Sequence, residues 1–169
     1  MLAAPFTRAV VALFIVLFAG SFADAAIILV PTDLAPESQY RLAFVTSGTT
    51  NATSSNIAYY NDFVTTQAAL QSALSSLSTT WKAVGSTASI SARDNTGTSP
   101  GLTGVPIYRL DGVRIAANNA DLWDGTLLSP LNMTQDSNYL EPPTPIRVYT
   151  GSNYSGQGAS NSARSLGAS

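Results

Sequence analysis

The chain of 169 residues contains neither cysteine nor histidine. Without disulfides the fold must be held by a hydrophobic core, which a domain of roughly 150 residues can build unaided. The same absence excludes thiol catalysis, cysteine metal ligation and a serine activated by histidine. A Ser-Lys pair would have to use Lys82, the only lysine, and no motif surrounds it. Only paired carboxylates, as in glycan hydrolysis, remain open to catalysis in principle.

Residues 1–25 have the order of a secretory signal peptide. Arg8 precedes an apolar run over residues 9–22, and small residues follow at Ala23 and Ala25. This run is shorter than the roughly 20 residues that cross a bilayer as a helix, which favours a cleaved signal over the competing interpretation, a membrane anchor. The sequence therefore predicts a secreted chain, extracellular or at the cell surface, with no membrane span after cleavage.

The charge pattern excludes one class of partner. The net charge is −2 and only 11% of residues are charged. After the signal, the arginines stand singly, at positions 41, 93, 109, 114, 147 and 164. Without a basic stripe the surface lacks the footprint of a nucleic-acid-binding protein, and an anionic polysaccharide is a poor partner for the same reason. We expect an extracellular glycan or protein as the ligand, and no nucleic acid.

A single main amphipathic helix is predicted over residues 60–77. Its core-facing side chains recur at spacings of three and four, with one polar gap. They are Tyr60, Phe63, Gln67, Leu70, Leu74 and Leu77. The helix needs a side-chain oxygen at its start, which Ser54, Ser55 or Asn56 can supply.

Short strands are predicted at residues 26–30, 40–46 and 146–150. The segment from Thr79 to Thr87 is predicted to be extended, because its tryptophan and β-branched threonines suit a strand, and Trp81 is expected in the core.

Three further segments read as turns or loops. Residues 91–106 are rich in Gly, Ser, Thr and Pro and predict a long loop. Asp111-Gly112 separates "VPIYRL" from "VRIA", which predicts a two-residue hairpin turn with positive φ at both positions. Residues 156–169 form a low-complexity tail that we expect to be poorly ordered, which leaves residues 26–155 as one domain.

The segment "ANNADLWDG" poses the question of a metal site. Asn118, Asn119, Asp121 and Asp124 offer the oxygen ligands that calcium takes. Their spacing does not match the twelve-residue calcium loop, and no bidentate glutamate follows. The alternative is that these residues cap turns while a neighbouring tryptophan points inward. The pattern favours turns, with a weak calcium site left open and no other cofactor indicated.

Taken in order, several pieces of the chain resemble the endostatin-like domain. They are "YRLAFVTSGTT", a helix, "LSTTWKAVGS", "VPIYRLDGVRIA", "DLWDG" and "RVYTGSNYSG". The resemblance covers residues 38–160 and implies an α+β fold, a variant of the C-type-lectin-like fold with a twisted mixed sheet and one main packing helix. The family is known for zinc held by histidines, a basic heparin surface and disulfides. This chain has none of them, so neither zinc nor heparin binding carries over.

These observations predict a secreted, non-catalytic binding or surface-matrix module rather than an enzyme. Because one fold serves many functions, this expectation depends on the resemblance. The first alternative is a calcium-dependent glycan-binding module with its site at residues 118–124. The second is a glycan hydrolase that uses paired carboxylates.

Overall fold

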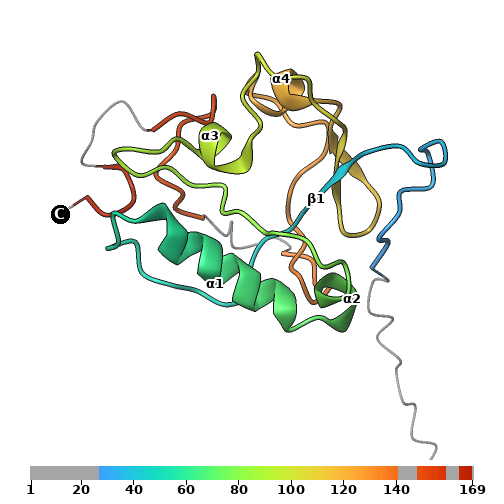
Figure 1. Cartoon of the computed structure of the whole chain (residues 1–169), viewed down its shortest axis with the longest axis horizontal. Coiled ribbons are helices and arrows are strands. Elements are labelled where there is room, and N and C mark those ends of the chain that lie inside the picture. Colours follow the sequence, from blue (N-terminus) through green and yellow to red (C-terminus); the bar gives the residue numbers. More distant parts are fainter. Residues whose placement is uncertain (1–26, 141–147, 159–163, 169) are drawn as a thin grey trace, which may run out of the picture.

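The computed structural model describes residues 27–140, 148–158 and 164–168, and the predicted signal peptide lies outside them. The described elements, in chain order, are β1 (Arg41–Ala43), α1 (Ile57–Ala69), α2 (Ser72–Ser75), α3 (Ala92–Thr96), β2 (Ile107–Arg109), β3 (Arg114–Ala116) and α4 (Asn119–Leu122). The architecture is therefore mixed α+β, as expected. Figure 1 shows α1 and α4 on opposite sides of the molecule, with β1 between them. Across the described residues, we find no helix with the length and apolarity to cross a membrane.

The three strands form one small mixed sheet in the order β1-β2-β3. β1 pairs parallel with β2, with Leu42 opposite Tyr108, and β2 pairs antiparallel with β3, with Tyr108 opposite Arg114. All three residues of the central strand are buried. The parallel pair joins segments far apart in sequence, and the crossover between β1 and β2, residues 44–106, contains α1, α2 and α3.

The predicted helix is present, but in two pieces. Asn56 is its N-cap, and its side-chain oxygen accepts a hydrogen bond from the Ala58 amide at 3.0 Å. The helix stops because Gln71 adopts an extended backbone, with φ −108° and ψ 117°, before α2 begins. The break turns Leu70 out to solvent, where it is 67% exposed, while Leu74 is buried as predicted.

The core consists of three groups of buried side chains. The first combines Ala68, Leu74, Leu110 and Met133, the second Tyr60, Ala83 and Leu166, and the third Ile107, Ile115 and Ala116. The first two groups join residues from distant parts of the chain, and the third lies within the hairpin. The helix, the hairpin and the C-terminal segment therefore depend on one another for burial.

Two predicted strands are absent from the described residues. Residues 27–30 form no strand, although the Ile28 amide donates to the Leu110 carbonyl at 2.6 Å. The segment after Thr79 is irregular up to an isolated bridge at Thr87. There the Ala83 amide donates to the Asn61 side chain at 2.9 Å, because α1 and not a strand lies beside it. Trp81 packs on the first core group, edge to face with Phe44 at 5.0 Å between ring centroids.

The long loop predicted at residues 91–106 contains a short helix, α3. The Ser91 hydroxyl accepts the Asp94 amide and donates to the Asp94 carboxylate, which closes the first turn. Gly97 ends the helix at φ +64°, in the left-handed region that favours glycine. The Ser-x-x-Asp pattern at the start and the glycine at the end were signals of this helix in the sequence.

The hairpin lies where it was predicted, but its turn differs. The Arg109 amide donates to the Val113 carbonyl at 2.9 Å, and the Gly112 amide to the Arg109 carbonyl at 3.0 Å, so the loop has three residues and not two. Gly112 has φ +78°, whereas Asp111 is not among the residues with positive φ. The two-residue prediction is wrong because the Asp111 carboxylate folds back onto Arg109 instead of facing solvent at the tip.

The C-terminal segment also departs from expectation. Residues 148–150 are not a strand, and residues 141–147, which include the start of the predicted one, lie outside the described residues. The predicted tail is partly core: Leu166 is 5% exposed and bridges to Thr87. The Gly167 amide donates to the Ala52 carbonyl at 2.7 Å. An apolar side chain and its backbone partners therefore hold a segment that composition alone marked as disordered.

Candidate functional site

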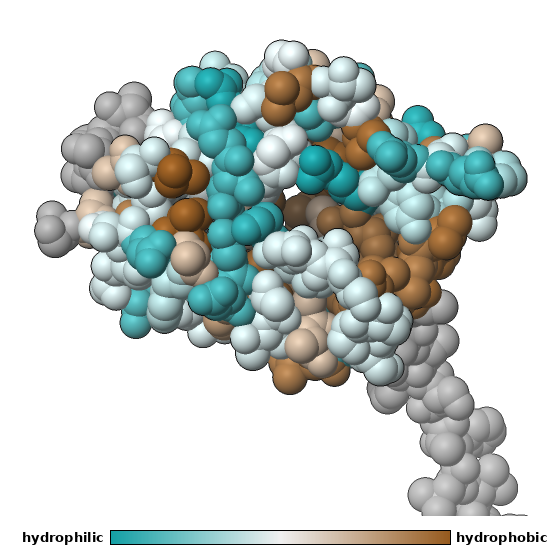
Figure 2. Space-filling model, in the orientation of Figure 1, coloured by the Kyte–Doolittle hydropathy of each residue, from teal (hydrophilic) through white to brown (hydrophobic). Residues whose placement is uncertain are grey.

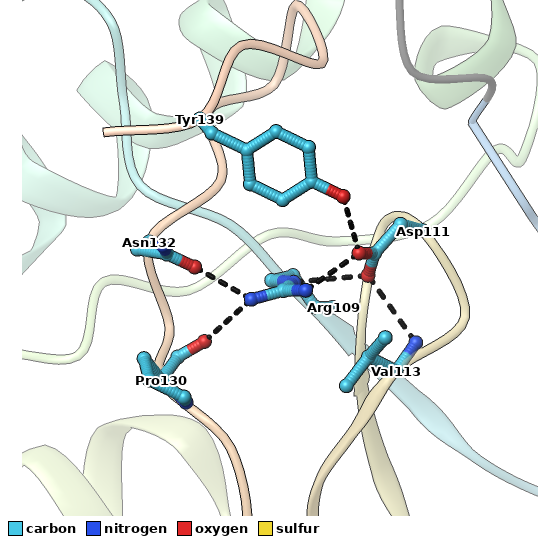
Figure 3. A network of polar contacts seen from close by, with 6 residues as sticks. All are labelled: Arg109, Asp111, Val113, Pro130, Asn132 and Tyr139. Atoms are coloured by element: carbon cyan, nitrogen blue, oxygen red, sulfur yellow. Dashed lines mark hydrogen bonds and ion pairs between the residues drawn. The ribbon is translucent and has the colours of Figure 1, made fainter. Parts of the chain in front are cut away.

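The hairpin carries the most strongly connected polar group of the described residues (Figure 3). Arg109 and Asp111 form a two-pronged pair, with Nε 2.9 Å from Oδ1 and Nη2 2.6 Å from Oδ2. The Tyr139 hydroxyl donates to Oδ2 at 2.7 Å and the Val113 amide to Oδ1 at 3.2 Å. Burial by itself would raise the pKa of Asp111, but these hydrogen bonds outweigh it and hold the pKa at about 2.

The remaining donors of Arg109 are also occupied. Its Nη1 donates to the Pro130 carbonyl at 3.0 Å and to the Asn132 side chain at 2.5 Å, and its guanidinium lies over the Tyr139 ring. Arg109 is only 8% exposed. A buried ion pair in which every guanidinium nitrogen is hydrogen-bonded is a structural clamp, and it ties the hairpin to residues 130–139.

The segment predicted as a metal site is built from turns. The Asn118 side chain accepts the amides of Ala120 and Asp121 and so caps α4. An Asp121 oxygen accepts the Ala117 amide at 2.6 Å. An Asp124 oxygen accepts the Thr126 amide at 2.8 Å. These three oxygens are thus each directed to a different stretch of backbone.

Asn119, the fourth predicted ligand, is the exception. It is 1% exposed, and its amide nitrogen lies 3.4 Å from the carbonyls of Ser99 and Leu102. Its Oδ1 is buried and has no hydrogen-bond partner. Gly104 packs directly on it, since a Cβ there would lie 2.7 Å from Oδ1. No group of three Asp or Glu side chains in the described parts of the chain is arranged to hold a metal ion.

Trp123 is half-buried and joins two loops. Its indole N–H lies 3.0 Å from both the carbonyl and the hydroxyl of Thr98. Its ring packs on Gly156, where a Cβ would lie 2.6 Å from the ring carbons. Tyr154, 76% exposed, covers Gly125 in the same way. The tryptophan therefore holds the end of α4 against the loop after α3 and the turn at residues 153–157.

A concave site lies beside α3, and we call it the α3 cleft. Its volume is about 360 Å³, and its lining comes from residues 87–91, the first turn of α3 and the C-terminal segment. The lining residues are Thr87, Ala88, Ser89, Ile90, Ser91, Arg93, Asp94, Gln157, Gly158 and Ser165. Figure 2 shows hydrophilic residues over α3 and along a band that crosses this face. The cleft is thus small, polar and rich in hydroxyl groups.

Two charged side chains stand together in the α3 cleft. Asp94 is exposed, and its oxygens accept hydrogen bonds from the hydroxyls of Ser91 and Ser99. The hydrogen bond from Ser91, followed by that from Ser99, lowers the pKa of Asp94, so the carboxylate is ionised at neutral pH. The adjacent guanidinium of Arg93 contributes to the same shift.

Arg93 differs from the arginines of the hairpin. The two ion pairs of the described residues belong to Arg109 and Arg114, and neither includes Arg93. Its Nε is buried and has no hydrogen-bond partner among the described residues. A buried donor without an acceptor costs about 1–3 kcal/mol, and in native proteins it calls for an explanation such as a bound group.

Sequence reasoning did not single out the α3 cleft. Its residues fell in the predicted loop at 91–106 and the predicted tail at 156–169. The cap signal at Ser91 and Asp94 was present in the sequence, but nothing local indicated that Gln157, Gly158 and Ser165 lie beside it. Compared with protein-family models, with curated proteins and with solved structures, the chain shows no significant match.

Proposed function

We propose that this chain is a secreted, non-catalytic binding or surface-matrix module on an endostatin-like scaffold. The observation that carries the proposal is the contrast between the polar groups of the hairpin and those of the α3 cleft. The hairpin ion pair holds the fold together, whereas the α3 cleft is lined by a charged pair, of which Asp94 is exposed, and by the exposed Ser89. Convergent polar groups in a concave site can fix the orientation of a ligand, and the lining here is more polar than that of most ligand pockets. The secretory pattern of residues 1–25 directs the module to an extracellular ligand, a glycan or a protein.

The proposal is tested in two steps. The chain with residues 1–25 is expressed with export machinery, and mass spectrometry of the medium is expected to find an N-terminus near Ala26. The exported protein is then applied to arrays of extracellular glycans and matrix proteins, with product analysis of the same glycans. Binding without hydrolysis supports the proposal. A chain that stays inside the cell with Met1 intact, or one that cleaves a glycan, contradicts it.

A second candidate function, calcium-dependent glycan binding at residues 118–124, is favoured by one observation. The buried Oδ1 of Asn119 has no partner, and an ion or a water molecule near α4 would supply one. With only two carboxylates, Asp121 and Asp124, such a site would fall at best in the roughly 10⁻⁴–10⁻³ M range of extracellular calcium modules.

A further inference from the structure

We infer that the α3 cleft binds a neutral sugar residue, with Arg93 donating hydrogen bonds to its hydroxyls and Asp94 accepting them. The inference rests on the proposed function as a binding module and names the ligand class of its site. No metal ion is needed for this binding, because the two charged groups that would contact the sugar are the side chains of Arg93 and Asp94.

The charge of the α3 cleft selects a neutral ligand. Arg93 and Asp94 are its only charged lining residues, and their charges cancel. A ligand anion attracted by Arg93 would face the ionised carboxylate of Asp94, and a cation would face the guanidinium. A sugar hydroxyl is both donor and acceptor, so it can bridge a guanidinium and a carboxylate that stand side by side.

The hydrogen-bonding capacity that remains in the α3 cleft matches this ligand. Each Asp94 oxygen accepts one serine hydroxyl and keeps lone pairs for a ligand. The guanidinium of Arg93 makes no hydrogen bond or ion pair with a described residue, so its terminal N–H groups keep their donor capacity. The exposed Ser89 adds a hydroxyl to the wall, whereas Thr87 and Ser165, which also line it, are buried. The lining can therefore exchange hydrogen bonds with several hydroxyls of one ring at once.

Size and shape agree with the same ligand class. At about 360 Å³ the α3 cleft is near the lower end of ligand sites, which run from roughly 300 to 1,000 Å³. Ile90 also lines it and is 37% exposed, which offers an apolar surface to the C–H face of a sugar ring. A mono- or disaccharide fits these dimensions, whereas a longer chain would extend out of the cleft.

The test uses the secreted chain in buffer that contains EDTA. Glucose, galactose, mannose, cellobiose and lactose are titrated by calorimetry and by NMR of ¹⁵N-labelled protein, with glucuronate and sulfate as anionic comparators. We expect one or more of the neutral sugars to bind and to shift the amides of Ser89, Asp94 and Gly158. The amide of Asp111 on the hairpin is expected to stay in place. This readout needs no mutation and does not depend on the folding of a variant.

Matched variants assign the binding to the two charged groups. Arg93→Gln and Asp94→Asn are each expected to weaken the sugar by about tenfold or more, the effect of losing a hydrogen bond to a charged group. Lys82→Gln and Asp62→Asn remove the same charges from exposed positions outside the cleft and are expected to leave affinity within about twofold. Thermal melting of all four confirms that they are folded.

Two results from the comparators and the variants overturn the inference without touching the proposed function. In one, an anionic comparator binds the α3 cleft more tightly than every neutral sugar. In the other, the glycan or protein found on the arrays binds equally well after Arg93→Gln and Asp94→Asn. Failure of all five neutral sugars to bind also overturns it. If no array ligand binds at all, the proposed function falls as well.

Discussion

Two pairs of arginine and aspartate close together in the sequence have different roles in this molecule. In the hairpin, Arg109 and Asp111 are buried, bond each other twice and use further partners from residues 113–139. On α3, Arg93 and Asp94 lie at an open cleft, and the carboxylate is held by serine hydroxyls while the guanidinium makes no ion pair with a described residue. The same residue types therefore stabilise the fold in one place and remain available for a ligand in the other.

The difference lies in spacing and burial. Residues two apart across a tight turn can face each other, so Arg109 meets Asp111 within the hairpin. Residues one apart on a helix do not face each other, so Asp94 turns to the cap at Ser91 and Arg93 to the cleft. Burial then decides the energetics, because a desolvated pair must be complete whereas an exposed one contributes little.

The largest effect on stability is expected from the removal of Asp111. Asp111→Ala leaves the buried guanidinium of Arg109 without its counter-charge, and we expect the free energy of unfolding to fall by about 3–5 kcal/mol. Asp33→Ala is the matched control. It breaks the exposed pair with Arg114, in which the side chains of Arg114 and Asp33 are 38% and 51% exposed, and the 3.2 Å hydrogen bond from the Tyr108 hydroxyl. Together these should cost about 1–2 kcal/mol. Urea denaturation measures both, and equal losses would contradict the distinction between a buried clamp and a surface pair.

The pH dependence of stability sharpens the same point. The pKa of Asp111 is about 2 in the folded chain against 3.8 ordinarily, so its contribution is full above pH 3.8 and is lost as pH falls through 2. The linked loss is about 2 kcal/mol. Unfolding of the wild type and of Asp111→Asn is compared between pH 5 and 2. A parallel decline of the two curves would mean that other carboxylates, and not Asp111, govern acid stability.

Gly112→Val tests whether the turn holds the clamp in place. Valine resists the observed φ of +78°, and its Cβ would also lie 3.3 Å from the Ile28 side chain. We expect a loss of about 1–2 kcal/mol. Gly101→Val is the control, because nothing lies within 4 Å of a Cβ there and its φ is not positive. Unchanged melting of Gly112→Val would mean that the three-residue turn is not required.

Calcium is expected to have the smallest effect. At a concentration equal to its dissociation constant, a single bound ion stabilises by only about 0.4 kcal/mol. Melting of the wild type and of Asp121→Asn combined with Asp124→Asn is compared in calcium and in EDTA. A rise of several degrees in the melting temperature with calcium, seen in the wild type alone, would mean that residues 118–124 form a metal site and not only turns. The candidate ligand site would then lie there and not in the α3 cleft.

The parts of this molecule that the sequence predicted are local in origin. The helix start at Asn56, the hairpin around Gly112 and the cap function of Asn118 each follow from one side chain and the backbone within a few residues of it. The spacing pattern of the main helix predicted the burial of Leu74 but not the exposure of Leu70, because the break at Gln71 depends on what packs beyond it.

By itself, then, the sequence determined where the chain turns, where its helices are capped, and that a core without disulfides must hold it. Only the tertiary structure decided which polar groups stabilise the fold. It brought Asn132 and Tyr139 to Arg109, set Leu166 into the core and placed Gln157 and Ser165 beside α3. The physical reason is range: a cap or a glycine turn is chosen by its neighbours, whereas burial and pairing depend on segments that meet only when the whole chain has folded.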